Sequence, residues 1–291
     1  MLSSIQYGEM MPVKDIPLND LIEFARQVRL DIVFQTNKAG SGHPGGPLSA
    51  TDFSTVLYKS IMNYNAKDPR WPERDMFIMS KGHCSALLYS LLARIGVIPP
   101  EWLETFRKTG SPLQGHPNML KCPGVEVSTG SLGQGLSVGN GMALAMKLNG
   151  QTDRRVYVIA GDGEIQEGQY WEALMTSAHY NLDNVCLTVD VNGLQIDGTT
   201  REVMNLDPLP DKFRAFNWHV IEINGHSFEE AIDAYTEASQ TKGKPTVVLA
   251  LTTKGKGVSY MENQAGWHGR PPNDAEYAIA VKDINAMTYP W

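Results

Sequence analysis

The chain has 291 residues, of which 42% are hydrophobic and 20% are charged, a balance typical of a globular protein with a substantial core. Its net charge of -7 argues against nucleic acid or an anionic membrane as the main partner. The three cysteines predict no disulfide framework and match no zinc site, and the amino-terminal residues do not resemble a signal peptide. No stretch reaches the roughly 18 uncharged apolar residues of a membrane span. We therefore expect a cytoplasmic protein.

Helical and strand patterns alternate along the chain. Residues 1–17 read as an irregular arm, and a helix is predicted over 18–38, ended by Gly40. A glycine- and proline-rich loop follows at 41–47. The remaining predicted elements are buried helices at 48–62 and 84–95, strands at 155–160, 185–190, 220–223 and 246–251, and helices at 167–180 and 228–240. This order predicts an α/β fold, a parallel β-sheet with helices on both faces, whose ligands bind beyond the carboxyl ends of the strands.

Two glycine-rich acidic segments each follow a predicted strand. They are GDGEIQEG (161–168) and DVNGLQIDG (190–198), which place Asp162 and Asn192 thirty residues apart. Adjacent strands of a βαβ unit would bring both side chains to one edge of the sheet. A hard divalent cation prefers oxygen ligands, so Asp162, Asn192 and the carbonyl of Leu194 are candidate ligands, with a diphosphate filling the other positions.

The glycines of these segments have two interpretations. Gly161 and Gly163 could let the backbone approach a diphosphate and offer it N–H donors near a helix start. Taken alone, GDG and NG could equally be tight turns chosen for positive φ. Because both motifs directly follow buried strands at this spacing, we favour the binding site.

The flanking sequence resembles a known family. GDG followed by asparagine about thirty residues later resembles the thiamine diphosphate motif, and further segments resemble the N-terminal domain of transketolase, in family order. They are SGHPGGPLS (41–49), SKGHCSALLYSLL (80–92), GHPN (115–118), GVEVSTGSLGQGLSVGNGMA (124–143) and WHGRPP (267–272). The resemblance covers nearly the whole chain. It implies the thiamine diphosphate-binding fold, with 18–291 as a single diphosphate-binding domain after an arm at 1–17.

The resemblance also implies roles for individual residues. Asp162, Asn192 and the Leu194 carbonyl would hold Mg²⁺, or Ca²⁺ or Mn²⁺. Ser131 departs from the proline common in many transketolases, although serine occurs there in others. The residues implied to contact thiamine diphosphate are His83, Gly130, Ser131, Leu132, Asp162, Gly163, Glu164, Asn192, Lys254 and His268.

Candidates for the chemistry are three histidines and one glutamate. His43, His116 and His268 lie in loops bounded by glycine or proline, and imidazole suits both proton transfer and hydrogen bonding to sugar hydroxyls. Glu167 has two interpretations that we hold equal. By the resemblance it lies at a subunit interface and links two active sites through a proton network. Otherwise it is a solvated glutamate stabilised by the helix dipole.

Other reactive side chains carry no such context. We expect the remaining histidines to make structural hydrogen bonds and the cysteines to be buried small residues. These are His179, His219, His226, Cys84, Cys122 and Cys186.

The glutamate that activates the cofactor lies, in this family, on a second, pyrimidine-binding domain, which is absent here. We expect that domain on a partner chain, the C-terminal transketolase subunit, in an α2β2 assembly; a fragment of a longer chain is the alternative. The expected activity is transfer of a ketol unit from a ketose phosphate to an aldose. Alternatives are the alpha subunit of a 2-oxo-acid decarboxylase or dehydrogenase, and a degenerate non-catalytic subunit. A deoxyxylulose phosphate synthase is disfavoured because its first loop differs from SGHPGGP.

Overall fold

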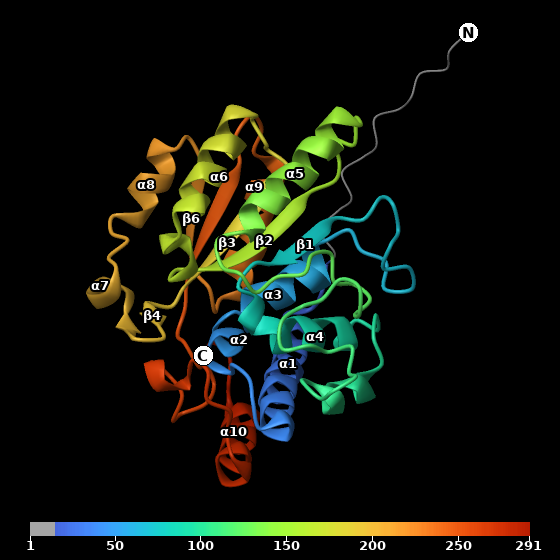
Figure 1. Ribbon diagram of the computed structural model, residues 1–291, viewed down its shortest axis with the longest axis vertical. Coiled ribbons are helices and arrows are strands. Elements are labelled where there is room, and N and C mark those ends of the chain that lie inside the picture. Colours follow the sequence, from blue (N-terminus) through green and yellow to red (C-terminus); the bar gives the residue numbers. More distant parts are fainter. Residues whose placement is uncertain (1–14) are drawn as a thin grey trace.

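The centre of the molecule is a five-stranded sheet in which every neighbouring pair is parallel (Figure 1). The computed structural model describes residues 15–291, so the predicted arm lies largely outside the described residues. The strand order is β1-β2-β3-β7-β6, which confirms the predicted parallel α/β fold. The strands are β1 (Met76–Met79), β2 (Val156–Gly161), β3 (Val185–Val191), β6 (His219–Asn224) and β7 (Thr246–Leu251).

Helices and short turns connect the strands. The first helix ends, as predicted, where Gly40 adopts the left-handed conformation with φ 57°. The longer helices are α1 (Leu18–Ala39), α4 (Ser85–Arg94), α5 (Gly135–Leu148), α6 (Gly168–His179), α9 (Phe228–Gln240) and α10 (Asp274–Ala286). The shorter elements are α2 (Gly45–Ser49), α3 (Thr51–Val56), η1 (Leu57–Ile61), η2 (Gly82–Cys84), η3 (Pro100–Thr105), η4 (Glu164–Gln166), α7 (Thr200–Val203), α8 (Leu209–Ala215), η5 (Ala265–Trp267) and the hairpin β4 (Leu194–Gln195)–β5 (Gly198–Thr199).

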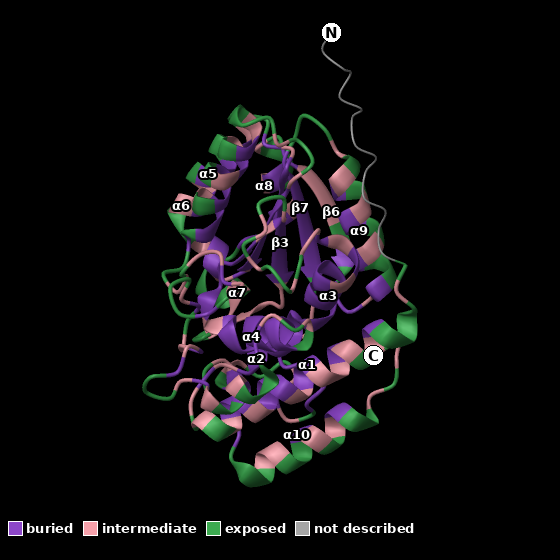
Figure 2. Ribbon diagram, turned by 90° about the vertical axis from the view of Figure 1, so that its right-hand side faces the viewer, coloured by how far each residue is buried: buried purple, intermediate pink, exposed green. Residues whose placement is uncertain are grey.

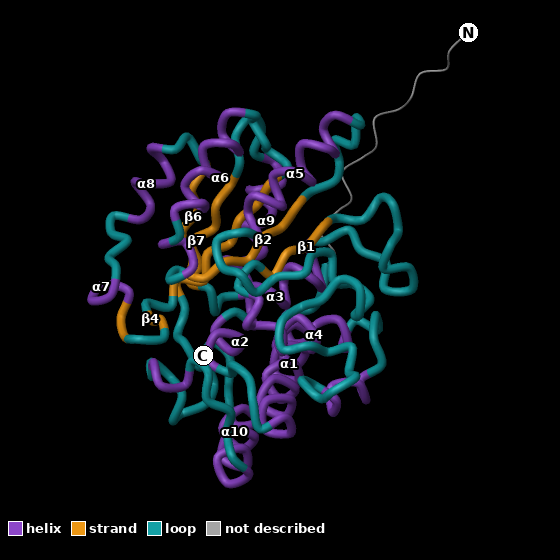
Figure 3. The backbone as a smooth tube through the Cα atoms, viewed as in Figure 1, coloured by secondary structure: helices purple, strands orange, loops and turns teal. Residues whose placement is uncertain are grey.

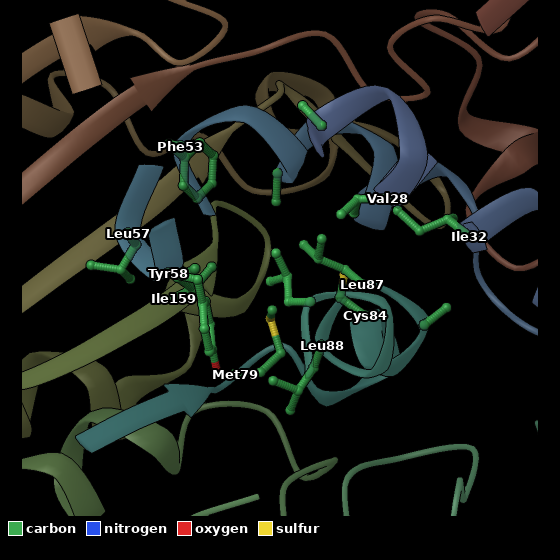
Figure 4. Packing of buried hydrophobic residues seen from close by; sticks show 14 of the residues in the cluster. Val28, Ile32, Phe53, Leu57, Tyr58, Met79, Cys84, Leu87, Leu88 and Ile159 are labelled. Atoms are coloured by element: carbon green, nitrogen blue, oxygen red, sulfur yellow. The ribbon is translucent and has the colours of Figure 1, made fainter. Parts of the chain in front are cut away.

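Alternation along the strands builds one core on each face of the sheet. In β2, Val156 and Val158 belong to the cluster shared with α5, α6 and α8, whereas Tyr157 and Ile159 belong to the cluster shared with α1, α3, α4 and α9. Figure 2 shows the buried strands β3 and β7 between these two helical layers, with the edge strand β6 only partly buried. Figure 4 shows the second core, where Met79 and Ile159 lie among side chains from α1, α3 and α4. Both faces are therefore covered, as the apolar strands predict.

Several local elements were not predicted or were predicted incompletely. Strand β1 was not predicted, because its four residues are too few for a clear period. Helix α5 was also not predicted, since its sequence contains glycines, which are poor helix formers. At Gly139, an added Cβ would lie 3.0 Å from Val158, so the small residue lets the helix approach the sheet. The predicted loop at 41–47 is partly wrong, since α2 begins at Gly45. Among residues 15–291, no helix is long and apolar enough to cross a membrane.

The loops that follow the strands gather at one edge of the sheet. All five strands run in the same direction, so their carboxyl ends meet there. Figure 3 shows much of the chain around α4 as loop. The GDG and DVNG motifs lie at the ends of β2 and β3, whereas the loops of His43 and His116 follow helices, so the candidate site is assembled from both kinds of connection.

Candidate active site

The predicted metal ligands lie together at the ends of β2 and β3. Gly161 of β2 pairs with Asp190 of β3, which places the two motifs side by side. The Asp162 carboxylate accepts the backbone N–H of Gly193 at 2.6 Å. Asn192 Oδ1 accepts the N–H of Leu194 at 3.1 Å. The turn at 192–194 thus contains two of the predicted ligands and is hydrogen-bonded to the third, Asp162.

This donor set fits a divalent cation that is shared with phosphate. Burial, followed by the nearby Asp190 charge, raises the pKa of Asp162 to about 6. A cation beside this carboxylate would oppose that rise. Among residues 15–291 there is no group of three His, Cys, Asp or Glu side chains suited to a metal. The chain offers one carboxylate, one amide oxygen and one backbone carbonyl instead, which leaves positions for a diphosphate.

A buried ion pair between Lys81 and Asp190 lies at this edge of the sheet. Asp190 is fully buried and accepts hydrogen bonds from Lys81 Nζ at 2.5 Å and Ser49 Oγ at 2.6 Å. Thr252 also donates to it. Asn192 Nδ2 donates to the same carboxylate at 3.0 Å, which fixes the orientation of the Asn192 amide. Sequence reasoning missed Lys81 and Asp190, although an aspartate that ends an apolar strand was the available signal.

Three predicted histidines form a cluster. The ring centroids of His43 and His83 are 5.3 Å apart, those of His43 and His268 5.4 Å, and those of His83 and His268 4.9 Å. Burial is the main cause that lowers the pKa of His43 to about 4 and of His268 to about 3. It also lowers the pKa of His83 far below its ordinary value. All three imidazoles are therefore neutral at pH 7.

One ammonium joins the metal edge to the histidine cluster. Lys254 Nζ donates to the carbonyl of Leu194 at 3.1 Å and to His268 Nδ1 at 3.0 Å. Burial lowers the pKa of Lys254. His116 lies on the neighbouring loop, where a Cβ added at Gly130 would lie 3.1 Å from its ring. The structure thus brings His43, His83, His268 and Lys254 to the predicted cation site, with His116 beside the loop at 130–133.

The loop at 130–133 is held by backbone contacts and by Glu164. A Cβ added at Gly82 would lie 2.7 Å from the backbone N of Gly130, so the two segments touch. The Glu164 carboxylate accepts the N–H of Gly133 at 3.3 Å and of Gly161 at 3.2 Å, and it is bonded to Ser80. Burial raises the pKa of Glu164 to about 7. Glu164 therefore joins two loops, and its predicted contact with the cofactor stays a prediction.

The outward-facing candidates are exposed. Ser131 and Leu132 are exposed on the loop. Glu167 is exposed directly before the first residue of α6, and its side chain makes no capping hydrogen bond there. Neither interpretation of Glu167 is decided by this position.

The predicted structural residues have the expected environments, apart from one histidine. His226 Nε2 accepts the N–H of Thr253 at 2.9 Å, so its Nδ1 carries the proton donated to Asp52 at 2.8 Å. His219 lies 2.6 Å from a Glu237 oxygen. His179 is exposed and contacts the Tyr180 ring, with no structural hydrogen bond among residues 15–291. The cysteines are buried and unpaired as predicted, and burial raises the pKa of each thiol (Cys84, Cys122 and Cys186).

Comparison with known proteins places this geometry in one family. The family model described as "Transketolase, thiamine diphosphate binding domain" matches residues 19–287. One of the subunits of the apulose-4-phosphate transketolase of Phocaeicola vulgatus is 45% identical over 89% of this chain and 91% of its own length. The 6-deoxy-6-sulfo-D-fructose transketolase subunit SqwG of a Clostridium species is 40% identical over 91% of this chain and 96% of its own.

Solved structures agree in fold. Transketolase from Campylobacter jejuni superposes with a TM-score of 0.87 at 34% identity, covering 93% of this chain and 43% of that chain. This chain therefore spans less than half the length of that transketolase. By sequence and by fold, the chain belongs to the transketolase family, in which it is a thiamine diphosphate-binding domain.

Proposed function

We propose that this chain is the thiamine diphosphate-binding subunit of a two-chain transketolase, which transfers a ketol unit from a ketose phosphate to an aldose acceptor. The observation that carries the proposal is the single ammonium of Lys254, which bonds both the Leu194 carbonyl at the metal edge and His268 of the histidine cluster. A cofactor held at this edge by its diphosphate would lie next to groups able to bind sugar oxygens. The full-length similarity to two transketolase subunits supports the same activity.

Some residues of this chain would hold the cofactor, and others would recognise the substrate. Asp162, Asn192 and the Leu194 carbonyl would hold Mg²⁺, or Ca²⁺ or Mn²⁺, and through it the diphosphate. When bound, thiamine diphosphate supplies the electron sink of the reaction. Lys254 adds positive charge beside the diphosphate. His43 and His268, neutral at pH 7, would hydrogen-bond the hydroxyl and carbonyl oxygens of the substrate, together with His116.

A partner chain would complete the site. We propose that a pyrimidine-domain subunit supplies the activating glutamate, in a cytoplasmic α2β2 assembly. The matched relatives are named as subunits, and the transketolase of Campylobacter jejuni is more than twice as long as this chain.

The test is ketol transfer by the two-chain complex. The chain is co-expressed with its pyrimidine-domain partner and assayed with thiamine diphosphate and Mg²⁺. Donors are xylulose 5-phosphate, apulose 4-phosphate and 6-deoxy-6-sulfofructose, with ribose 5-phosphate or glyceraldehyde 3-phosphate as acceptor. We expect transfer that needs both chains and is lost in Asp162→Ala, whereas Asp153→Ala, at an exposed loop position, retains it.

The other outcomes separate the alternatives. Decarboxylation of a 2-oxo acid without ketol transfer would favour the oxo-acid enzymes. Failure to bind metal and cofactor, with the partner present, would favour a non-catalytic subunit.

A further inference from the structure

Arg107 occupies an unusual backbone position beside the histidine cluster. Its φ is 59°, in the left-handed region that non-glycine residues rarely adopt. The preceding Phe106 is buried in the core, and the Arg107 N–H donates to the carbonyl of Leu113 at 2.9 Å. This turn directs a half-buried guanidinium toward the site.

The guanidinium contacts two loops. Arg107 Nη1 donates to Ser41 Oγ at 2.9 Å, and Nη2 contacts His43 Nδ1 at 3.3 Å and the carbonyl of Gly115 at 3.4 Å. A Cβ added at Gly115 would lie 3.1 Å from the guanidinium carbon, so the glycine makes room for this side chain. Arg107 therefore ties the loop of His43 to the loop that carries His116.

Hydrogen-bond chemistry then determines the proton position on His43. A guanidinium has only donors, so the His43 Nδ1 that it contacts must be the acceptor, and in a neutral ring the proton must be on Nε2. We propose that Arg107 is a positioning residue that holds His43 as the neutral Nε2–H tautomer, so that His43 donates a hydrogen bond to a sugar oxygen of the substrate. This inference rests on the proposed function only for the identity of that acceptor.

The surroundings of Nε2 leave it free to donate. Among residues 15–291, His43 Nε2 has no hydrogen-bond partner. It is also not a fully buried atom, so solvent or a ligand can reach it. A Cβ added at Gly269 would lie 3.4 Å from it, so the absence of a side chain there keeps this edge open.

The charges around His43 favour the neutral ring. Arg107 and Lys254 are the cations that face it, and His83, His116 and His268 are the neighbouring titratable groups. A cation hydrogen-bonded at Nδ1 opposes protonation of the ring. A neutral donor recognises an oxygen with a free lone pair, such as a hydroxyl or carbonyl of a sugar, and cannot neutralise a phosphate. We therefore expect His43 to contact a hydroxyl or carbonyl oxygen of the substrate.

The test reads the tautomer directly. Full-length chain labelled with ¹⁵N-histidine is examined by ¹H–¹⁵N correlation at pH 7.5, and the His43 signal is assigned by its loss in His43→Gln. We expect protonated Nε2 and unprotonated Nδ1 in the wild type. Arg107→Met, which removes all donors, should move His43 toward an average of the two tautomers, and Arg107→Lys, which keeps a donor-only cation, should restore the Nε2–H signature at least in part. Wild-type His43 protonated at Nδ1, or an unchanged tautomer in Arg107→Met, would overturn the inference.

A second variant covers the case in which Arg107→Met does not fold. Gly115→Ala keeps the guanidinium but crowds it, and should shift the His43 tautomer in the same direction. Gly141→Ala is the matched control, because an added Cβ there meets nothing within 4 Å. An unchanged tautomer in a folded Gly115→Ala would count against the inference.

Kinetics of the two-chain complex add a separate readout. Arg107→Met should lower kcat/KM by at least about twofold, because an equal mixture of tautomers leaves only half of the chains with the Nε2–H donor. The dissociation constant for thiamine diphosphate should stay within about twofold, because Arg107 contacts none of the predicted cofactor ligands. Unchanged kcat/KM with a shifted tautomer would refute the substrate contact. Absence of ketol transfer in the wild type, with the expected tautomer present, would refute the proposed function and leave the positioning by Arg107 intact.

Discussion

Replacing Asp190 by asparagine should both destabilise the chain and weaken cofactor binding. The exposed fractions of Asp190 and Lys81 are 0% and 2%, so the ammonium would lose its counter-ion in a site that water does not reach. Removing one partner of a buried ion pair costs about 3–5 kcal/mol. The asparagine would also present an NH₂ group to donors that now share the carboxylate, including Ser49 and Thr252.

The effect on the cofactor follows from Asn192. Its Nδ2 now donates to Asp190, and that bond aims Oδ1 at the edge where the cation is proposed to bind. Loss of a group that orients a metal ligand typically costs about tenfold to a hundredfold in metal affinity. We therefore expect the Mg²⁺-dependent dissociation constant for thiamine diphosphate to rise by about that factor in Asp190→Asn.

Urea unfolding and cofactor titration measure the two effects separately. Asp211→Asn is the matched control, since Asp211 pairs with Arg214 on the exposed surface, where solvent screens such pairs and they contribute little to stability. Adding Lys81→Met to Asp190→Asn removes the stranded charge and should recover much of the lost stability. If Asp190→Asn unfolded within about 1 kcal/mol of the wild type and bound the cofactor with unchanged affinity, this reasoning would be refuted.

Two further perturbations are predicted. Gly82→Ala should displace the loop at 130–133, because the new Cβ would lie 2.7 Å from the backbone N of Gly130. We expect urea unfolding to show at least about 2 kcal/mol of destabilisation, together with weaker cofactor binding. Wild-type values for both measurements would contradict this contact. Acidification should also cost stability through His43. Burial lowers the pKa of His43 to about 4, so below pH 6.5 this side chain is protonated in the unfolded chain but still neutral in the folded chain. The free energy of unfolding therefore falls as the pH falls from 6.5 to 4. In His43→Gln, the free energy of unfolding should fall less steeply with acidification than in the wild type. The difference should be less than about 1.4 kcal/mol per pH unit, because the ring is half-buried. The control His179→Gln, at an exposed site, should match the wild type.

The local sequence pattern was sufficient to predict the strands that carry the site. The apolar runs before Gly161 and Asn192 predicted β2 and β3, and their parallel pairing brought the two motifs together as expected. The helix predicted over 228–240 has the same bounds in α9. Periodicity and turn residues act over a few positions, so a single sequence contains enough information to predict such features. The transketolase resemblance added the histidine loops, three of which the structure gathers into one cluster.

Only the tertiary structure decided how the charges are paired. Lys81 meets Asp190 across 109 positions, and Arg107 meets His43 across 64. Nothing in the local sequence distinguishes Lys81 and Arg107 from solvated side chains, because their burial depends on the packing of segments far apart in the chain. The same packing turns Glu164 away from solvent and into the backbone of two loops. The sequence therefore determined which groups are available for the chemistry, whereas the fold determined their protonation and orientation, because both depend on distant neighbours and on the exclusion of water.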